Sequence, residues 1–316
     1  IAYFMICAVG IVTTLVYGTV HQPVIALFYF VVAALALIFV ADAAFSGVLR
    51  ISQARLQIPL VLLGVYALIQ VVPFGNLTTP AAISGTSRTL SIEPFATQVA
   101  ALHIFSLSTF FFVALSVLDS SARLRRLVSV LTIFGFGYAF FAILQSVLSP
   151  DKIYGIYQPV AGVPFGSFVN RHDFAAIVEM TIALPLGLLF SGSLRSDKRL
   201  LYVVAIALMG SALLLSGSRG GLVALIAEII LLIMLTSNLK GKKNLVLKAA
   251  LSLVLIFAAV GGAVFVGGDT SLTRFSETVA SDNVTSSRTQ IWSVTAKVIA
   301  QYFPFGAGLG AFSQAY

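Results

Sequence analysis

The sequence predicts an all-α, polytopic membrane protein: a bundle of about nine transmembrane helices, followed by an extracytoplasmic loop with a short amphipathic helix. The 316 residues are 59% hydrophobic and 9% charged, whereas soluble domains carry about 25% charged residues. The apolar residues form continuous runs close to the about 20 residues that a helix needs to cross the hydrocarbon. Membrane barrels would instead show alternating segments of about ten residues.

Nine runs meet or approach the spanning length: roughly 1–18, 23–45, 57–73, 99–118, 127–148, 173–192, 200–215, 221–237 and 249–267. We therefore expect residues 1–267 to form the helical bundle, and residues 268–316 to begin a large loop on the extracytoplasmic side. Because residue 1 is Ile and Tyr316 falls inside a loop segment, we expect a fragment in which this loop is truncated.

The Lys and Arg residues are concentrated in alternate loops: four such loops together hold 12 of the 19. Such loops are normally cytoplasmic, so the N-terminus is predicted to be cytoplasmic as well. This topology accounts for most of the net charge of +8 without a nucleic-acid partner. Cys7 is the only cysteine, which excludes a disulfide framework and a thiolate metal site.

The first motif lies at the start of the sixth span. Asn170, Arg171, His172 and Asp173 form a polar cluster at a predicted helix N-terminus, whose free N–H groups and positive dipole end favour an anion. The alternative is a capped helix start, with Asp173 as the cap and Arg171 reaching the lipid headgroups. The adjacent His172 and Asp173 are only weak evidence for a metal site.

The second motif is the turn Ser216–Gly221 between the seventh and eighth spans. Its glycines, Gly220 and Gly221 among them, allow successive N–H groups beside Ser218 to converge on an anion. Arg219 would supply the charge. The alternative is a simple hairpin between two helices, where Gly and Ser are expected.

The third motif lies in the outer loop. Ser287–Gln290 has the form of a capping box, so we expect a helix to start near Arg288 and to end at Pro304. It is too polar to span and is predicted to lie along the membrane surface, carrying Trp292. The following Pro304–Gly310 does not follow a strand, which excludes a dinucleotide fold, and is more typical of a flexible turn than of a ligand cradle.

Arg171, Arg219 and Arg288 therefore lie at the face opposite the basic loops, against the usual bias. A guanidinium group binds phosphate bidentately, so we expect a lipid-linked phosphate or pyrophosphate substrate. Glu179 and Glu228 lie within spans, where ionisable groups are costly and tend to be functional.

Together, and in this order, the three motifs resemble those of the bacterial O-antigen ligase and O-antigen polymerase family. The resemblance covers about residues 70–316 and is most specific at Ser216–Gly221. It departs from the family where His172-Asp173 replaces the commoner Asn-His. The family's catalytic-type histidine lies further along the outer loop, beyond this sequence, as do further spans.

This resemblance implies a glycosyltransferase of polysaccharide or lipopolysaccharide biosynthesis that uses no metal, nucleotide sugar or other cofactor. It would move a glycan from undecaprenyl diphosphate to an acceptor at the periplasmic face of the inner membrane. Arg171, Arg219 and Arg288 would be catalytic by stabilising the pyrophosphate leaving group. The residues expected to contact substrate are Asn170, His172, Ser218, Gly220, Gly221 and Trp292.

The acceptor stays open: a glycolipid gives a ligase, a growing lipid-linked glycan gives a polymerase, and a protein side chain gives a protein glycosyltransferase. The alternative function is a transporter of polysaccharide or lipid-linked glycan, which predicts polar residues deep within several spans. A non-catalytic membrane scaffold is a third class. Apart from donor and acceptor, membrane lipids are the only expected partners.

Overall fold

The computed structural model is helical throughout its regular structure, which confirms the all-α prediction. It describes residues 1–49, 51, 54–75, 88–160, 162–237, 250–257, 259–262, 264 and 283–316. Within these ranges there is no strand, only two isolated β-bridges. The predicted boundary between residues 267 and 268 lies outside the described residues, so it stays a prediction.

Six of the described helices are long and apolar enough to cross a membrane, which makes this a multi-pass membrane protein. They are α2 (Gln22–Ser46), α4 (Pro94–Val117), α5 (Ser121–Leu148), α6 (Arg171–Ser191), α7 (Ser196–Leu215) and α8 (Arg219–Ser237).

The other three expected spans correspond to shorter apolar helices: α1 (Ala2–Leu15), α3 (Ile58–Val71) and a helix over Ala250–Gly262. Helix α1 stops early because Tyr17 and Thr19 adopt positive φ angles of 52° and 60°, which an α-helix does not allow. Helix α3 stops before Pro73, since Val72 is extended with ψ 124°, the conformation favoured before proline.

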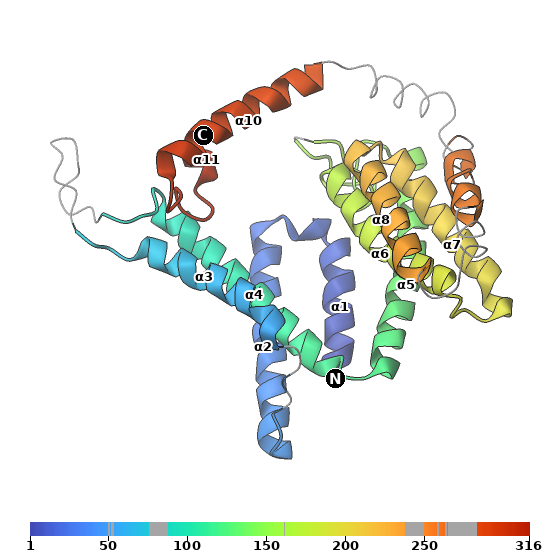
Figure 1. The fold of residues 1–316 in the computed structure, drawn as a ribbon, viewed down its shortest axis with the longest axis horizontal. Coiled ribbons are helices and arrows are strands. Elements are labelled where there is room, and N and C mark those ends of the chain that lie inside the picture. Colours follow the sequence, from blue (N-terminus) through green and yellow to red (C-terminus); the bar gives the residue numbers. More distant parts are fainter. Residues whose placement is uncertain are drawn as a thin grey trace. The chain divides into compact units, whose positions relative to one another are not determined.

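The chain divides into two compact units. The first comprises Ile1–Ile6, Ala26–Asp119 and Ser281–Tyr316, and the second comprises Cys7–Ile25 and Ser120–Ala280. In Figure 1, α3 lies along α4 in the first unit, and α5 to α8 form one group in the second.

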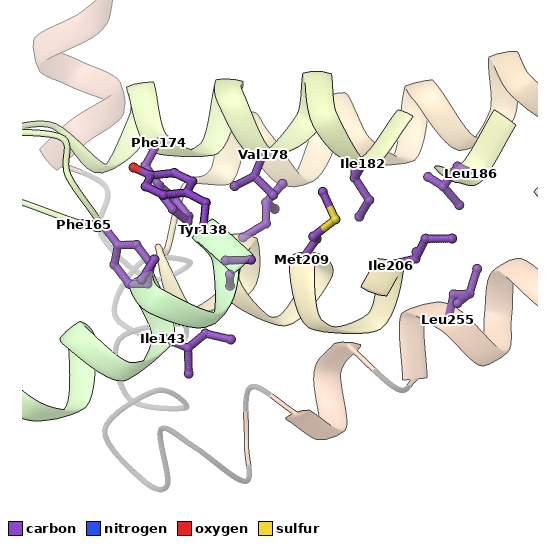
Figure 2. Packing of buried hydrophobic residues seen from close by; sticks show 14 of the residues in the cluster. Tyr138, Ile143, Phe165, Phe174, Val178, Ile182, Leu186, Ile206, Met209 and Leu255 are labelled. Atoms are coloured by element: carbon purple, nitrogen blue, oxygen red, sulfur yellow. The ribbon is translucent and has the colours of Figure 1, made fainter. Parts of the chain in front are cut away.

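The second unit has its core between α6 and its neighbours. Phe174, Val178, Ile182 and Leu186 recur every four residues, so they lie on one face of α6. Each is at most 1% exposed. Figure 2 shows this row facing Met209 and other apolar residues.

The first unit contains α10 (Asn283–Tyr302) and the short α11 (Phe312–Ala315). The prediction that α10 starts near Arg288 was wrong by five residues, and Ser287–Gln290 is not its capping box. Neither Pro nor Gly occurs between Asn283 and Arg288, so nothing in this stretch stops the helix. Its predicted end before Pro304 is confirmed. The first turns of α10 are described in backbone only, through residue 288.

Two glycines of α5 test the packing of the second unit. A Cβ atom on Gly135 would lie 2.5 Å from Cε of Met209 and 2.9 Å from Cβ of Thr181, whereas one on Gly137 would meet nothing within 4 Å. We expect Gly135→Val to destabilise the protein by roughly 1–3 kcal/mol, the usual cost of overpacking. Gly137→Val should change stability much less. Thermal unfolding of both variants in the same detergent measures the difference, and equal midpoints would contradict this packing.

Candidate functional site

The start of α6 is set by Asn170. This residue is extended (φ −121°, ψ 122°) and its side chain accepts a hydrogen bond from the His172 N–H at 3.0 Å. It is therefore the N-cap, and Arg171 is the first helical residue. Asp173 is not the cap, contrary to the alternative considered from the sequence, because the helix begins two residues before it. Its carboxylate instead lies in the first turn, where the helix dipole favours negative charge.

The loop that leads into α6 is held by buried hydrogen bonds. The Ser167 hydroxyl donates to the Thr14 carbonyl at 2.6 Å, and the Tyr138 hydroxyl lies 2.7 Å from the Ser167 hydroxyl oxygen. Since the Ser167 proton is used on a carbonyl, Tyr138 is the donor in the second bond. Tyr138 also accepts from the Ser167 N–H at 3.1 Å. Both side chains are at most 3% exposed, so the bonds fix the loop.

A second set of bonds involves Gln145 of α5. Its amide group donates to the Gly166 carbonyl at 2.6 Å and accepts from the Tyr154 N–H at 2.9 Å. The Tyr154 hydroxyl donates to the Leu15 carbonyl. Partial burial raises the pKa of Tyr154. The end of α1, the loop and α5 are thereby joined.

The turn between α7 and α8 does not form the predicted anion nest. Ser216 caps α7 and Gly217 is left-handed, with φ +66°, the common way for a helix to end. The N–H groups of Ser216 and Gly217 bond to α7 carbonyls, and that of Ser218 bonds to the Ser216 hydroxyl. These three N–H groups therefore point inward to protein acceptors and do not converge on an anion.

The first and second motifs meet in space. Nδ1 of His172 lies 3.0 Å from the Ser218 hydroxyl oxygen, across 46 residues of sequence. A Cβ atom on Gly217 would lie 3.2 Å from Nη1 of Arg171, so this guanidinium group lies beside the turn. The N-termini of α6 and α8 are thus neighbours, and each helix begins with an arginine.

Close packing of α6 and α8 makes this arrangement possible. A Cβ atom on Gly221 would lie 2.7 Å from Oε1 of Glu179 and 2.9 Å from the Cβ of Ala175. A side chain at this position would force Glu179 to turn away and α6 to shift at Ala175, so the packing favours glycine here. Ser218 accepts a hydrogen bond from the Gly221 N–H at 3.3 Å and so caps α8.

These features bring two arginines and two helix N-termini together at one end of a helix pair, with the carboxylates of Asp173 and Glu179 close by. Two helix dipoles present their positive ends side by side, with Arg171 half-buried and Arg219 exposed. His172 is exposed and contacts Ser218, which is 3% exposed. Chemically, the arrangement suits a phosphate or pyrophosphate group. Among the described residues, no group of three or more His, Cys, Asp or Glu is placed to hold a metal ion.

The third motif belongs to the other unit. Arg288 lies in the first part of α10, but its side chain is outside the described residues. Trp292 is 72% exposed on the same helix. The expected convergence of Arg288 and Trp292 with Arg171 and Arg219 therefore stays a prediction.

Sequence reasoning missed the residues that support the site. Tyr138 and Gln145 lie in a span, where polar side chains need partners, and this was the signal that should have singled them out. Glu179 and Gly221 were both noted from the sequence, but the close contact between them was not. The packing role of Gly221 has no local signature.

Comparison with known proteins shows a match to a protein family. Residues 204–316 match the model of a protein family described as O-antigen ligase. This match confirms the resemblance to the O-antigen ligase and polymerase family over residues 204–316. The matched part contains Arg219 and Arg288, whereas Arg171 lies before it. No curated protein and no solved structure matched the chain.

The neighbouring glycines Gly220 and Gly221 test the approach of α6 and α8. Gly221→Ala adds a Cβ where Glu179 and Ala175 already lie, whereas Gly220→Ala points into open space. We expect Gly221→Ala to lower the thermal unfolding midpoint. Gly220→Ala should leave it unchanged or raise it slightly, because Ala favours helix over Gly by up to about 1 kcal/mol. The packing described here is wrong if the two variants lose stability equally.

Proposed function

We propose that this multi-pass membrane protein, whose residues 204–316 match the O-antigen ligase family, transfers a glycan from undecaprenyl diphosphate to an acceptor. The family match supports O-antigen ligase-type glycan transfer in general. The donor, the face of the membrane and the roles of individual residues are our proposals.

The observation that carries this proposal is the convergence of the α6 and α8 N-termini. Arg171 lies beside the α7–α8 turn, and His172 contacts Ser218. A pyrophosphate has anionic oxygens on both phosphorus atoms, so it can engage two guanidinium groups at once, beside the positive ends of two helix dipoles. A single phosphate would need fewer of these donors.

In the proposed reaction the acceptor hydroxyl attacks the anomeric carbon of the donor glycan. The bond from that carbon to the phosphate oxygen breaks, and undecaprenyl diphosphate leaves with the electron pair. Arg171 and Arg219 stabilise the charge that develops on the departing diphosphate, which lowers the barrier. The acceptor's proton passes to a base, which the family resemblance places further along the outer loop than Tyr316.

His172 fits a supporting role in binding. When Nδ1 accepts the Ser218 hydroxyl proton, neutral His172 carries its own proton on Nε2. The ring is exposed, so Nε2 would donate to a pyrophosphate oxygen. Asn170 fixes the helix start, Gly220 in the first turn of α8 completes the proposed donor site, and Gly221 supports that site by packing against α6.

The long lipid tail requires an apolar surface next to this site. Val223 and Ile226 follow within two turns of Arg219 on α8 and are 68% and 51% exposed. Met180 on α6 is 66% exposed. We propose that the tail lies along these helices in the bilayer, with the N-terminus of the protein cytoplasmic and the pyrophosphate at the periplasmic face of the inner membrane.

The test is glycan transfer by the full-length protein in proteoliposomes, with an undecaprenyl diphosphate-linked glycan as donor. Glycolipid, glycan and protein acceptors are offered separately. We expect Arg171→Ala and Arg219→Ala each to lower kcat/KM by about 10²–10³-fold, as for loss of other groups that stabilise developing charge. Lysine at either position should restore only part of the lost kcat/KM, because its ammonium group binds phosphate without the bidentate geometry of a guanidinium group.

Arg195→Ala is the matched control. This arginine precedes α7, at the end of that helix opposite Ser216, its side chain is 80% exposed, and it pairs with Asp197 at 3.3 Å. Transfer should be unchanged in this variant. If the intact lipid-linked glycan crosses the bilayer and no acceptor is modified, the protein is a transporter. Equal transfer by Arg219→Ala and wild type would refute the pyrophosphate role.

A further inference from the structure

The glycine-rich segment after α10 is fastened to the α3–α4 pair. We expected Pro304–Gly310 to be a flexible turn, but its backbone bonds repeatedly to the ends of these helices. Figure 1 shows the chain after α10 returning to the end of α3 and α4, all within the first unit. The chain then enters α11 through Ala311, which is fully buried.

Gln70 of α3 makes the central contacts. Its side-chain amide donates to the Phe305 carbonyl at 2.8 Å and accepts from the Leu309 N–H at 3.0 Å. Its backbone carbonyl accepts from the Ser91 N–H at 2.9 Å. The residue is 3% exposed. One buried amide group therefore clamps the glycine-rich segment at two points four residues apart.

Neighbouring contacts complete this attachment. We call the hydrogen bonds from Tyr66, Gln70 and Ile92 to residues 305–309 the clip. The Tyr66 hydroxyl donates to the Phe305 carbonyl at 2.6 Å, and the Ile92 N–H donates to the Ala307 carbonyl at 2.9 Å. The backbone at Gly308 (φ +114°) approaches so closely that a Cβ there would lie 2.3 Å from the Ser91 hydroxyl oxygen. The glycine thus allows contact with α3–α4 and leaves no room at that point for a ligand.

We propose that Gln70 is a positioning residue for Arg288, acting through this clip. Arg288 and the clip lie at opposite ends of α10, separated by about 21 Å at a rise of 1.5 Å per residue. A helix is stiff, so a swing of about 10° at the clip would move Arg288 by roughly 4 Å. Displacements of about 1 Å can already cost a hundredfold in rate. This inference rests on the role that the family resemblance implies for Arg288, which is to stabilise the pyrophosphate leaving group during the proposed transfer.

The clip is tested without reference to activity, by hydrogen–deuterium exchange of the intact protein in proteoliposomes. In Gln70→Leu we expect the peptide that contains Leu309 to exchange at least tenfold faster than in wild type. Gln57→Leu is the matched control, because Gln57 is also buried, at the start of α3, and its amide atoms have no hydrogen-bond partner among the residues that the structure describes. Its variant should leave exchange at Leu309 unchanged.

Tyr66→Phe guards against a variant that fails to fold. It removes one bond from a side chain that is 38% exposed, and it should accelerate exchange less than Gln70→Leu. Wild-type exchange at Leu309 in both variants would overturn the clip.

The positioning role is tested by a double-mutant cycle on transfer. In the protein with native Arg288, Gln70→Leu should lower kcat/KM at least tenfold. In the Arg288→Ala variant, Gln70→Leu should lower it little further, because Gln70 acts through that arginine. Additive losses, or normal transfer by Gln70→Leu despite faster exchange, would refute positioning. If Arg288→Ala itself leaves transfer intact, the proposed function of that residue fails, while the exchange result still decides the clip.

Discussion

The candidate site depends on the close approach of α6 and α8 at Gly221. Where the Cβ of any other residue would stand, Glu179 and Ala175 of α6 already lie within 2.9 Å. This contact brings the two helix starts together, so that His172 reaches Ser218 and Arg171 reaches the α7–α8 turn. Two positive helix ends and two arginines are then held at one place. Separating the helices by the width of a methyl group would disperse the charge that the site concentrates.

Polar side chains inside the apolar spans serve the same end. Tyr138 and Gln145 lie in α5, where an unsatisfied hydrogen-bonding group is costly. Both side chains form hydrogen bonds with the loop before Arg171. The Tyr138 hydroxyl donates to the Ser167 hydroxyl, which in turn donates to the Thr14 carbonyl. The interior of the bundle therefore holds the arginine at the membrane face in place. Such polar residues are compatible with a fixed catalytic site as well as with a transport path, so their presence alone does not favour a transporter.

Glycines have distinct roles in the two conspicuous turns. Gly217 has the left-handed conformation that ends α7, while Gly221 provides space between helices. Gly308 has both roles: its φ angle is +114°, and the absence of a side chain allows close contact with Ser91. The glycine-rich segment after α10 is consequently a docked structural element. Its attachment by Gln70 gives α10 a fixed end, which a helix carrying a charged group such as Arg288 requires if that group is to act at a defined position.

The sequence by itself determined the all-α membrane architecture, the places of most helices and the three motifs, because hydropathy and helix-ending residues act over short stretches of chain. It misjudged features that depend on the exact path of the backbone, such as Asn170 rather than Asp173 as the cap and the early start of α10. Only the tertiary structure decided that the N–H groups of Ser216–Ser218 are already bonded and that His172 pairs with Ser218. It also placed Gln70 on Phe305 and Leu309, 235 and 239 residues away. Such pairings depend on how helices pack, and no local pattern encodes which side chains meet when the neighbouring helices come together.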